Sequence, residues 1–342
     1  MITLLLLLVL EAGVRWLAPQ QIDTEMVEGP SLAVKDTLLG HANRPGTVAR
    51  QRGPEFTAHY VVNGRGFRDR TVEERPRQMD ARRILLLGDS FTFGIGSDYD
   101  AIWPTIFEQT LKTQGHHVEV LNAGVPGYDT RTELQFLKHN WAALTPDLVV
   151  LVLLPHDLFT NAPLLPDDTA TVAQDVIVSD DEKAPMLHVV TLLQRIVLQN
   201  DWLYNQVYRN TGRARFFKMK PDETVRQQYQ TTEALLRRIH AFCRKRDVPF
   251  VVFTVPQQFQ VLAEANRYDA GSIDVRAVDR AVARLAAQAG FPHLAALDTL
   301  VQVYSRDRVP LYYRLDGHLT PRGNRIVGQY VAEHFQQLSA IR

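Results

Sequence analysis

Short, wholly apolar runs that alternate with segments of helical periodicity constrain the fold of this chain most. "RRILLLGD" (82–89) opens the series, and "AIWPTIFEQTLKTQG" (101–115) follows with helical spacing and a terminal glycine. Such a short apolar run is typical of a strand buried on both faces. Strand and helix in alternation predict parallel βαβ units with helices on both faces of the sheet. About five parallel strands are expected, within residues 82–89, 116–127, 146–157, 248–256 and 291–299.

Composition excludes several classes of function. The chain has 342 residues, of which 45% are hydrophobic and 22% charged, as in ordinary globular proteins. Its 38 basic and 38 acidic residues cancel, so no net field favours nucleic acid, and we expect no nucleic-acid partner. Cys243 is the single cysteine, which excludes an intrachain disulfide and a cysteine metal cluster. Its helical surroundings predict a buried structural thiol.

The first 18 residues contain an apolar run, "ITLLLLLVL" (2–10), followed by Glu11 and Arg15. Nine apolar residues are fewer than the roughly 20 that a spanning helix needs. Three interpretations stay open: a truncated membrane anchor, the apolar part of a signal peptide, or a helix packed on the body. A signal peptide is disfavoured because no basic residue precedes the run. We favour the anchor, and with it membrane association and an extracytoplasmic location, periplasmic or extracellular.

Two regions interrupt the alternating pattern. Residues 19–80 are rich in Pro, Gly, Arg and Glu and show one strand-like patch, "HYVVN". They predict an extended segment that lies against the body, or a linker. Residues 81–342 form the main domain, and about 160–220 form an insertion within it. The insertion contains an apolar helical segment, which favours a helical cap over the edge of the sheet.

Polar motifs follow the predicted strands at their carboxyl ends, where ligands bind in parallel sheets. "GDS" places Ser90 after the first strand, "NAGVPG" follows the second, and "PHD" the third. Serine becomes a nucleophile when a base removes its proton, and the base needs a carboxylate that orients it. "DGHLTPRGN" offers Asp316 and His318 before the last helix. The alternative is that Asp316 caps a turn and His318 is a surface imidazole.

Taken together, these motifs resemble the SGNH (GDSL) hydrolase family. "LLLGDSFTFGIG", "NAGVPGYDT" and "DGHLTPRGN" are similar to its first, second and last blocks. The resemblance implies a flavodoxin-like three-layer α/β/α sandwich. It also implies that Ser90 is the nucleophile, with Asp316 and His318 as its acid and base. The backbone N–H groups of Ser90 and Gly127 would then stabilise the oxyanion.

One block departs from the family pattern. The family carries Asn followed by Asp in its third block, whereas "LLPHDLFTN" has His156 followed by Asp157. An imidazole N–H can replace the lost amide donor, and Asn161 is an alternative donor from the same loop. Loss of one oxyanion donor typically slows turnover by about 10²–10³-fold. The substitution is compatible with a functional replacement, a slower enzyme or an inactive homologue.

The resulting hypothesis is a serine esterase that acts on O-acyl, in particular O-acetyl, esters of a carbohydrate or cell-envelope polymer. A polysaccharide O-acetyltransferase and a catalytically impaired glycan-binding homologue are the alternatives. Further candidate substrate contacts are Asp89, Tyr128, Asp157 and Asn161. We expect no cofactor, because neither a dinucleotide fingerprint nor a Walker loop follows the first strand, and no metal site, because the histidines lack zinc-ligand spacing.

Overall fold

A five-stranded parallel sheet forms the centre of the computed structural model, which describes residues 2–21, 25–74, 77, 80–161, 187–268, 271 and 273–335. The strands lie in the order β10-β9-β8-β6-β7, and every neighbouring pair is parallel. This is the flavodoxin-like order, in which the chain starts near the middle of the sheet and winds both ways. The strands are β6 (Arg82–Gly88), β7 (Val118–Gly124), β8 (Leu148–Leu153), β9 (Phe250–Thr254) and β10 (His293–Ala295).

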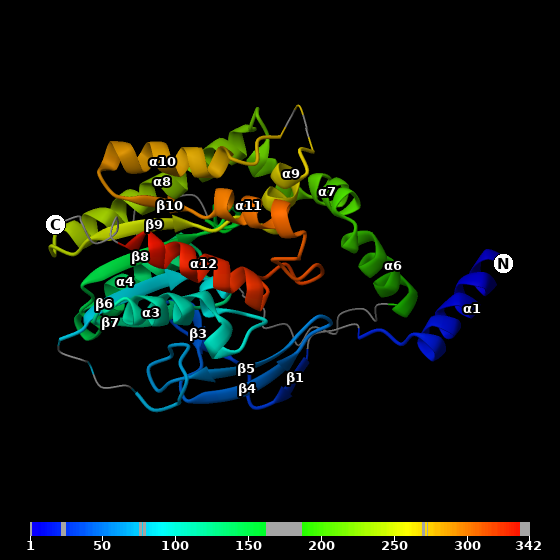
Figure 1. Ribbon diagram of the computed structural model, residues 1–342, viewed down its shortest axis with the longest axis horizontal. Coiled ribbons are helices and arrows are strands. Elements are labelled where there is room, and N and C mark those ends of the chain that lie inside the picture. The colour runs from blue at the N-terminus through cyan, green and yellow to red at the C-terminus, as the bar shows by residue number, and fades with distance from the viewer. Residues whose placement is uncertain are drawn as a thin grey trace.

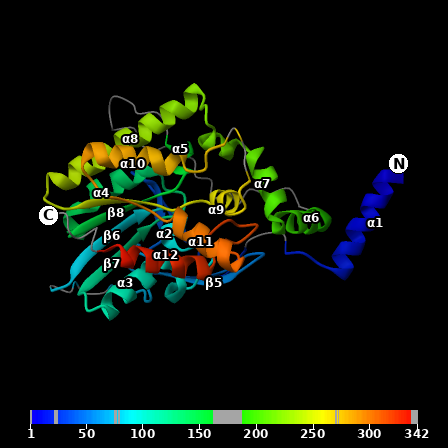
Figure 2. The same cartoon turned by 45° about the horizontal axis from the view of Figure 1, so that its top comes forward.

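Helices cover both faces of this sheet, as Figures 1 and 2 show. One face packs against α3 (Trp103–Thr113), α11 (Leu297–Asp307) and α12 (Pro321–Glu333). The other packs against α4 (Thr130–Leu144), α8 (Glu223–Arg244) and α10 (Ala277–Ala289). Alternate strand residues enter the two cores, so the strands are mostly apolar on both faces. The three-layer α/β/α prediction is confirmed.

Three helices that follow strands of the central sheet were not predicted from the sequence. They are α2 (Ser90–Phe93), α9 (Gln258–Ala265) and α11. The first two are four and eight residues long, too short for a clear period. The 3-10 helix η1 (Tyr99–Ala101) is shorter still.

The N-terminal region contains more regular structure than its one strand-like patch predicted. Three strands form an antiparallel sheet in the order β1-β4-β5, and β2 and β3 form a separate pair. Figure 1 shows the larger sheet below the main one. These strands are β1 (Glu25–Glu28), β2 (Ala33–Asp36), β3 (Gly40–Asn43), β4 (Thr47–Arg52) and β5 (Thr57–Val62).

Arg68 joins this N-terminal region to the main domain. Its side chain is almost fully buried, and its guanidinium lies 5.0 Å from the ring centroid of Tyr60 and 5.5 Å from that of Phe93. It donates to the backbone oxygens of His59 at 2.7 Å and Ser97 at 3.3 Å. Phe93 belongs to α2, and the buried cation therefore fastens β5 to the helix that carries Ser90.

The predicted insertion begins with α5 (Asp157–Thr160) and continues with α6 (His188–Gln199), α7 (Asp201–Arg209) and the 3-10 helix η2 (Gly212–Phe217). Residues 162–186 of this predicted cap lie outside the described residues. Helix α6 lies beside the N-terminal helix α1 (Ile2–Leu17), and both project from the body in Figure 1. Across the described part of the chain, each helix is too short or too polar to cross a membrane.

Candidate active site

Ser90 lies directly beyond the carboxyl end of β6, at the start of α2. The Asp89 carboxylate caps this helix by accepting the Phe91 backbone N–H at 2.9 Å. Close packing under α2 requires glycine at two strand ends: a Cβ atom on Gly88 would lie 2.1 Å from Thr92 Oγ1, and one on Gly124 would lie 2.4 Å from the Phe93 nitrogen. The sequence "GDS" therefore presents Ser90 on a short helix packed tightly on the sheet.

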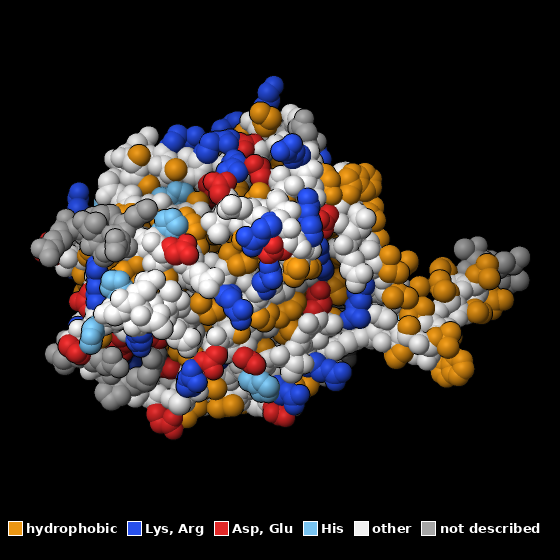
Figure 3. All heavy atoms as spheres, in the orientation of Figure 1, with side chains coloured by type: hydrophobic (Ala, Val, Ile, Leu, Met, Phe, Trp, Pro, Cys, Tyr) orange, Lys and Arg blue, Asp and Glu red, His pale blue; other side chains and the backbone are white. Residues whose placement is uncertain are grey.

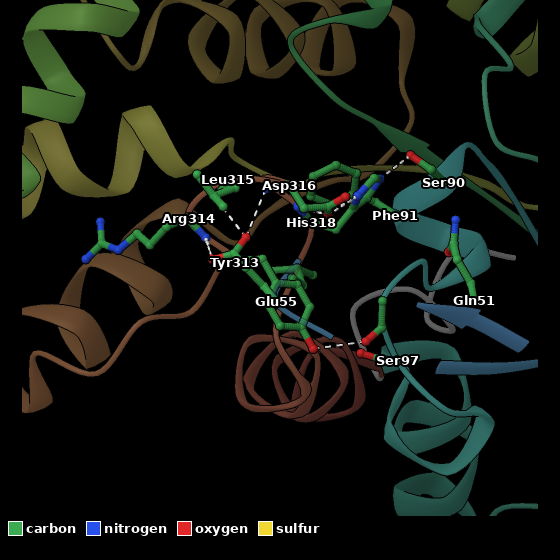
Figure 4. Close-up of polar contacts among 12 residues, drawn as sticks. Gln51, Glu55, Ser90, Phe91, Ser97, Tyr313, Arg314, Leu315, Asp316 and His318 are labelled. Carbon is green, nitrogen blue, oxygen red and sulfur yellow. Dashed lines mark hydrogen bonds and ion pairs between the residues drawn. The ribbon is translucent and has the colours of Figure 1, made fainter. Parts of the chain in front are cut away.

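Ser90, His318 and Asp316 form one chain of hydrogen bonds. His318 Nε2 lies 2.7 Å from Ser90 Oγ, and His318 Nδ1 lies 2.6 Å from Asp316 Oδ1 (Figure 4). The Phe91 ring packs against the imidazole, with 4.9 Å between ring centroids. The structure thus brings together three residues that are up to 228 positions apart in the sequence, in the geometry of a serine activated by an imidazole base.

The carboxyl of Asp316 is partly buried beside the imidazole. Burial acts to raise its pKa, but the hydrogen bonds and charge of His318 outweigh burial and hold the pKa of Asp316 below its ordinary value. Asp316 therefore stays ionised and able to orient His318. The loop itself turns at Gly317, whose φ of 88° favours glycine, and Gly317 N–H donates to the Tyr313 carbonyl at 2.9 Å.

Glu55, from the segment between β4 and β5, holds this loop in place. Its carboxylate accepts the backbone N–H groups of Arg314 at 2.8 Å, Leu315 at 2.7 Å and Asp316 at 3.0 Å (Figure 4). Three backbone donors on one carboxylate form a strong, directional anchor. Glu55 was not predicted from the sequence, because it lies in a region with neither a motif nor helical periodicity.

Gly127 lies in the turn that follows β7. The Tyr128 N–H donates to the Val125 carbonyl at 3.1 Å, which closes a turn with Pro126 and Gly127 at its two central positions. Gly127 has a φ of 88°, as the third position of a type II turn requires. Because β7 pairs with β6 in register from Arg82 to Gly88, this turn and Ser90 both leave the same edge of the sheet.

His156 follows β8 at the same edge and contacts two buried carboxylates. Its Nε2 lies 3.2 Å from Asp89 Oδ2 and 3.6 Å from Asp157 Oδ1. Buried Glu133 is a third carboxyl group of this cluster, and burial together with the charges of Asp157 and Asp89 raises its pKa. Burial and the charge of Asp89 likewise raise the pKa of Asp157. His156 is thus the basic group that faces this acidic cluster.

The same three residues are also a possible metal-ligand set. One ligand atom from each of Asp89, His156 and Asp157 lies within 4.8 Å of the others, and this is the single such group among the residues that the structure describes. Imidazole with carboxylates suits Zn²⁺ and related ions. The two distances from His156 Nε2 are equally those of an imidazole paired with carboxylates, so the geometry alone does not require a metal.

Four expected substrate contacts must be corrected, because the side chains of Asp89, Tyr128, Asp157 and Asn161 are buried. Asp89 caps α2, and Tyr128 donates its hydroxyl to the His41 carbonyl at 2.8 Å. Asp157 accepts the Leu154 N–H at 2.7 Å, and Asn161 donates to Thr232 Oγ1 at 2.9 Å. All four therefore support the loops around the site instead of facing a ligand.

A cavity of about 440 Å³ opens over the Ser90 hydroxyl, within the size range of small-molecule sites. Its aromatic walls come largely from the insertion, which contributes Tyr204, Tyr208 and Phe216. These residues were not predicted from the sequence, because Tyr204 and Tyr208 have ordinary helical spacing and Phe216 lies in a short 3-10 helix. The remaining lining residues are Ser90, Phe91, Pro155, His156, Arg213, Gln257, Gln258, Asp316, Gly317 and His318.

Comparisons with known proteins agree with this geometry. The model of the GDSL-like Lipase/Acylhydrolase family matches residues 86–326. An arylesterase of Vibrio mimicus is 30% identical over 83 residues, which are 24% of this chain and 42% of that protein. The chain thus spans less than half of this curated relative.

Solved structures of low sequence identity are also similar. One is a member of the lipolytic protein G-D-S-L family from Veillonella parvula DSM 2008, with 14% identity, a TM-score of 0.43, and 75% of this chain and 100% of that chain covered. Another is the acetyl xylan esterase AlAXEase, with 14% identity, a TM-score of 0.44, and 76% and 100% covered.

Proposed function

Since this chain belongs to the GDSL-like Lipase/Acylhydrolase family, we propose that it is a serine esterase in which Ser90 attacks the carbonyl carbon of an O-acyl ester. The hydrogen-bonded chain Ser90–His318–Asp316 carries this proposal. His318 Nε2 takes the hydroxyl proton as the Oγ–carbon bond forms, and Asp316 stabilises the resulting imidazolium. Collapse of the tetrahedral intermediate expels the alcohol, which receives that proton. Water then attacks the acyl-enzyme and releases the acid.

Backbone and side-chain donors at the strand ends stabilise the oxyanion in this proposal. The backbone N–H groups of Ser90 and Gly127 supply two of them, and His156 supplies the third. Because Nε2 of His156 faces Asp89 and Asp157, Nδ1 is the ring nitrogen left for the substrate. Nε2 contacts the acidic cluster, which orients the ring, and the N–H at Nδ1 donates to the oxyanion. The cluster beneath His156 thus compensates for the lost asparagine.

The proposed substrate is an O-acetyl or other short acyl ester of a carbohydrate or cell-envelope polymer. The aromatic rings of Tyr204, Tyr208 and Phe91 line the cavity and offer apolar faces to a sugar ring. Arg213 and Gln257 add donors for its hydroxyl groups. The cavity volume of about 440 Å³ has room for a short acyl group with one adjoining sugar unit.

A serine-reactive fluorophosphonate tests the nucleophile, and p-nitrophenyl acetate tests turnover. We expect the adduct mass on Ser90, and we expect Ser90→Ala and His318→Ala to lose about 10³-fold or more in kcat. Ser305→Ala and His117→Ala are matched controls at exposed positions and should retain the wild-type rate. An unlabelled, folded wild-type protein would overturn the esterase proposal. Acetate release from acetylated xylan, compared with the small ester, tests the carbohydrate preference.

A further inference from the structure

Helices α1, α6 and α7, together called the helical arm, expose an unusual amount of apolar surface. Leu5, Leu6, Leu7, Leu8, Val9 and Leu10 of α1 are each 50–63% exposed. Figure 3 shows this apolar surface projecting away from the body of the protein. Six consecutive helical residues point in all directions around the axis, at about 100° per residue. This stretch of α1 is therefore apolar on every side.

We propose that the helical arm docks on a lipid membrane and holds the catalytic cavity at the membrane surface. A second protein surface would cover one side of α1 and leave the other sides in water. Lipid surrounds an inserted helix, and a helix that is apolar all round requires such surroundings. Two tryptophans support this choice, because Trp16 is 83% exposed and Trp202 is 53% exposed. Tryptophan is enriched where proteins meet the membrane–water interface.

The apolar surface continues from α1 onto α6 and α7. Val190, Leu193 and Ile196 are exposed at every third position, which gives a stripe along α6, and Leu187 is exposed at its N-cap. Val207 of α7 is exposed as well. A stripe on one side of a helix is typical of a segment that lies in the interface plane with its polar side in water. The insertion is thus a second lipid contact beside the N-terminal one expected from the sequence.

Specific polar contacts fix α1 to α6, so the arm is one unit. The N-cap residue of α6, Leu187, provides no side-chain cap, and Glu11 of α1 supplies the missing acceptor. The Glu11 carboxylate accepts the backbone N–H groups of His188 at 3.0 Å and Val189 at 2.9 Å. Arg195 of α6 donates to the Pro54 carbonyl at 3.2 Å, which connects the arm to the N-terminal region next to Glu55.

Helix α7 is the part of the helical arm that reaches the active site. Its Tyr204 and Tyr208 line the cavity, while Trp202 and Val207 of the same helix are exposed. Its first residue, Asp201, pairs with Arg314 at 2.7 Å, two residues before Asp316. The exposed residues of α7 that would contact the membrane therefore lie on the same short helix as the residues that line the cavity. If the proposed esterase activity holds, the substrates are esters carried on or in the membrane.

Vesicle binding tests this proposal with the full chain. We expect the wild type to sediment with phosphatidylcholine vesicles, with or without phosphatidylglycerol, because apolar contacts drive the binding. Leu7→Asp and Leu193→Asp, one on each helix, should each lower the vesicle partition coefficient at least about tenfold. Val48→Asp with Val309→Asp is the matched control, since both valines are exposed on the body outside the arm. Its partition coefficient should equal that of the wild type.

Two further measurements separate this proposal from the esterase proposal. Ser90→Ala should bind vesicles as the wild type does, whatever the outcome of the activity tests. In the active protein, the rate on a vesicle-embedded ester relative to p-nitrophenyl acetate should fall at least about tenfold in Leu193→Asp. The proposal is overturned if Leu193→Asp partitions like the wild type. It is also overturned if the wild type ignores vesicles but forms a dimer that Leu193→Asp dissociates, since the arm would then bind a second copy.

Discussion

The Glu55 carboxylate accepts the backbone N–H of Asp316 at 3.0 Å, so a residue from the N-terminal region positions the carboxyl that orients His318. Glu55→Ala should lower kcat by about 10–100-fold, because hydrogen bonds to a charged group contribute about 1.5–3 kcal/mol each. KM for p-nitrophenyl acetate should change little, since Glu55 lies outside the cavity lining. Glu55→Gln, which keeps a neutral acceptor, should lie between Ala and the wild type.

Glu28→Gln is the control for this series, because Glu28 is an exposed residue of β1 paired with Arg50. It should keep the wild-type kcat. Glu55 would have no positioning role if Glu55→Ala retained full kcat. The same would hold if the loss of kcat were explained entirely by a smaller fraction of folded protein.

His156→Ala should lower kcat by about 10²–10³-fold, the usual effect of removing one oxyanion donor. His156→Asn should retain most of the rate, because its amide supplies a donor at the same place in the chain. Steady-state kinetics on p-nitrophenyl acetate measures both effects. A rate unaffected by His156→Ala would exclude the side chain from the oxyanion site. Loss of wild-type activity on dialysis against EDTA would instead identify the Asp89–His156–Asp157 cluster as a metal site.

Glu133→Gln should stabilise the protein at neutral and alkaline pH by about 1–3 kcal/mol. The raised pKa of buried Glu133 means that the folded protein holds a proton there that the unfolded chain releases above about pH 4.5. Wild-type stability therefore falls as pH rises from that value through the folded-state pKa. Glutamine resembles the protonated form, so denaturant unfolding of the variant should show a flatter pH dependence. Glu233→Gln, at a half-exposed position of α8, should leave the wild-type slope unchanged.

Cys243 should resist thiol reagents in the folded protein. Burial raises the pKa of its thiol to about 12, and the charge of Arg246 only partly opposes this. Reaction with Ellman's reagent in mildly alkaline buffer should be at least about 100-fold slower than in guanidinium chloride, where the same thiol is exposed. Rapid labelling of the native protein would show that the core around α8 opens locally.

The central sheet could be predicted from the sequence because its signals are local. Each strand from β6 to β10 lies in a short, mostly apolar run, and three of the four polar motifs lie at the end of a strand. Ser90 was singled out for this reason and His318 for its place beside Asp316 before the last helix, although the fold was needed to bring the two within 2.7 Å. The third block also drew attention to His156, but its neighbours Asp89 and Asp157 were expected to contact substrate. Their burial beneath the imidazole depends on packing that no local pattern reports.

The N-terminal region and the insertion lacked such local signals. Strands of four residues, such as β2 and β3, are too short for periodicity to identify them. Glu55 lies in a polar stretch, where a carboxylate is expected to be exposed. Its role depends on backbone groups about 260 residues away in the sequence. Tyr204 and Tyr208 follow ordinary helical spacing, so only the placement of α7 shows which of its sides lines the cavity.

The buried Arg68 side chain determines how far this protein can be shortened. A chain that began at Arg82 would keep the parallel sheet and every family motif. It would nevertheless lose the Arg68 guanidinium, which covers Phe93 and donates to Ser97, and the Glu55 carboxylate, which holds residues 314–316. Helix α2, which carries Ser90, and the loop that carries Asp316 and His318 would both lose contacts that hold them in place. The N-terminal region is therefore a working part of the catalytic unit, and its removal would leave the active site without this support.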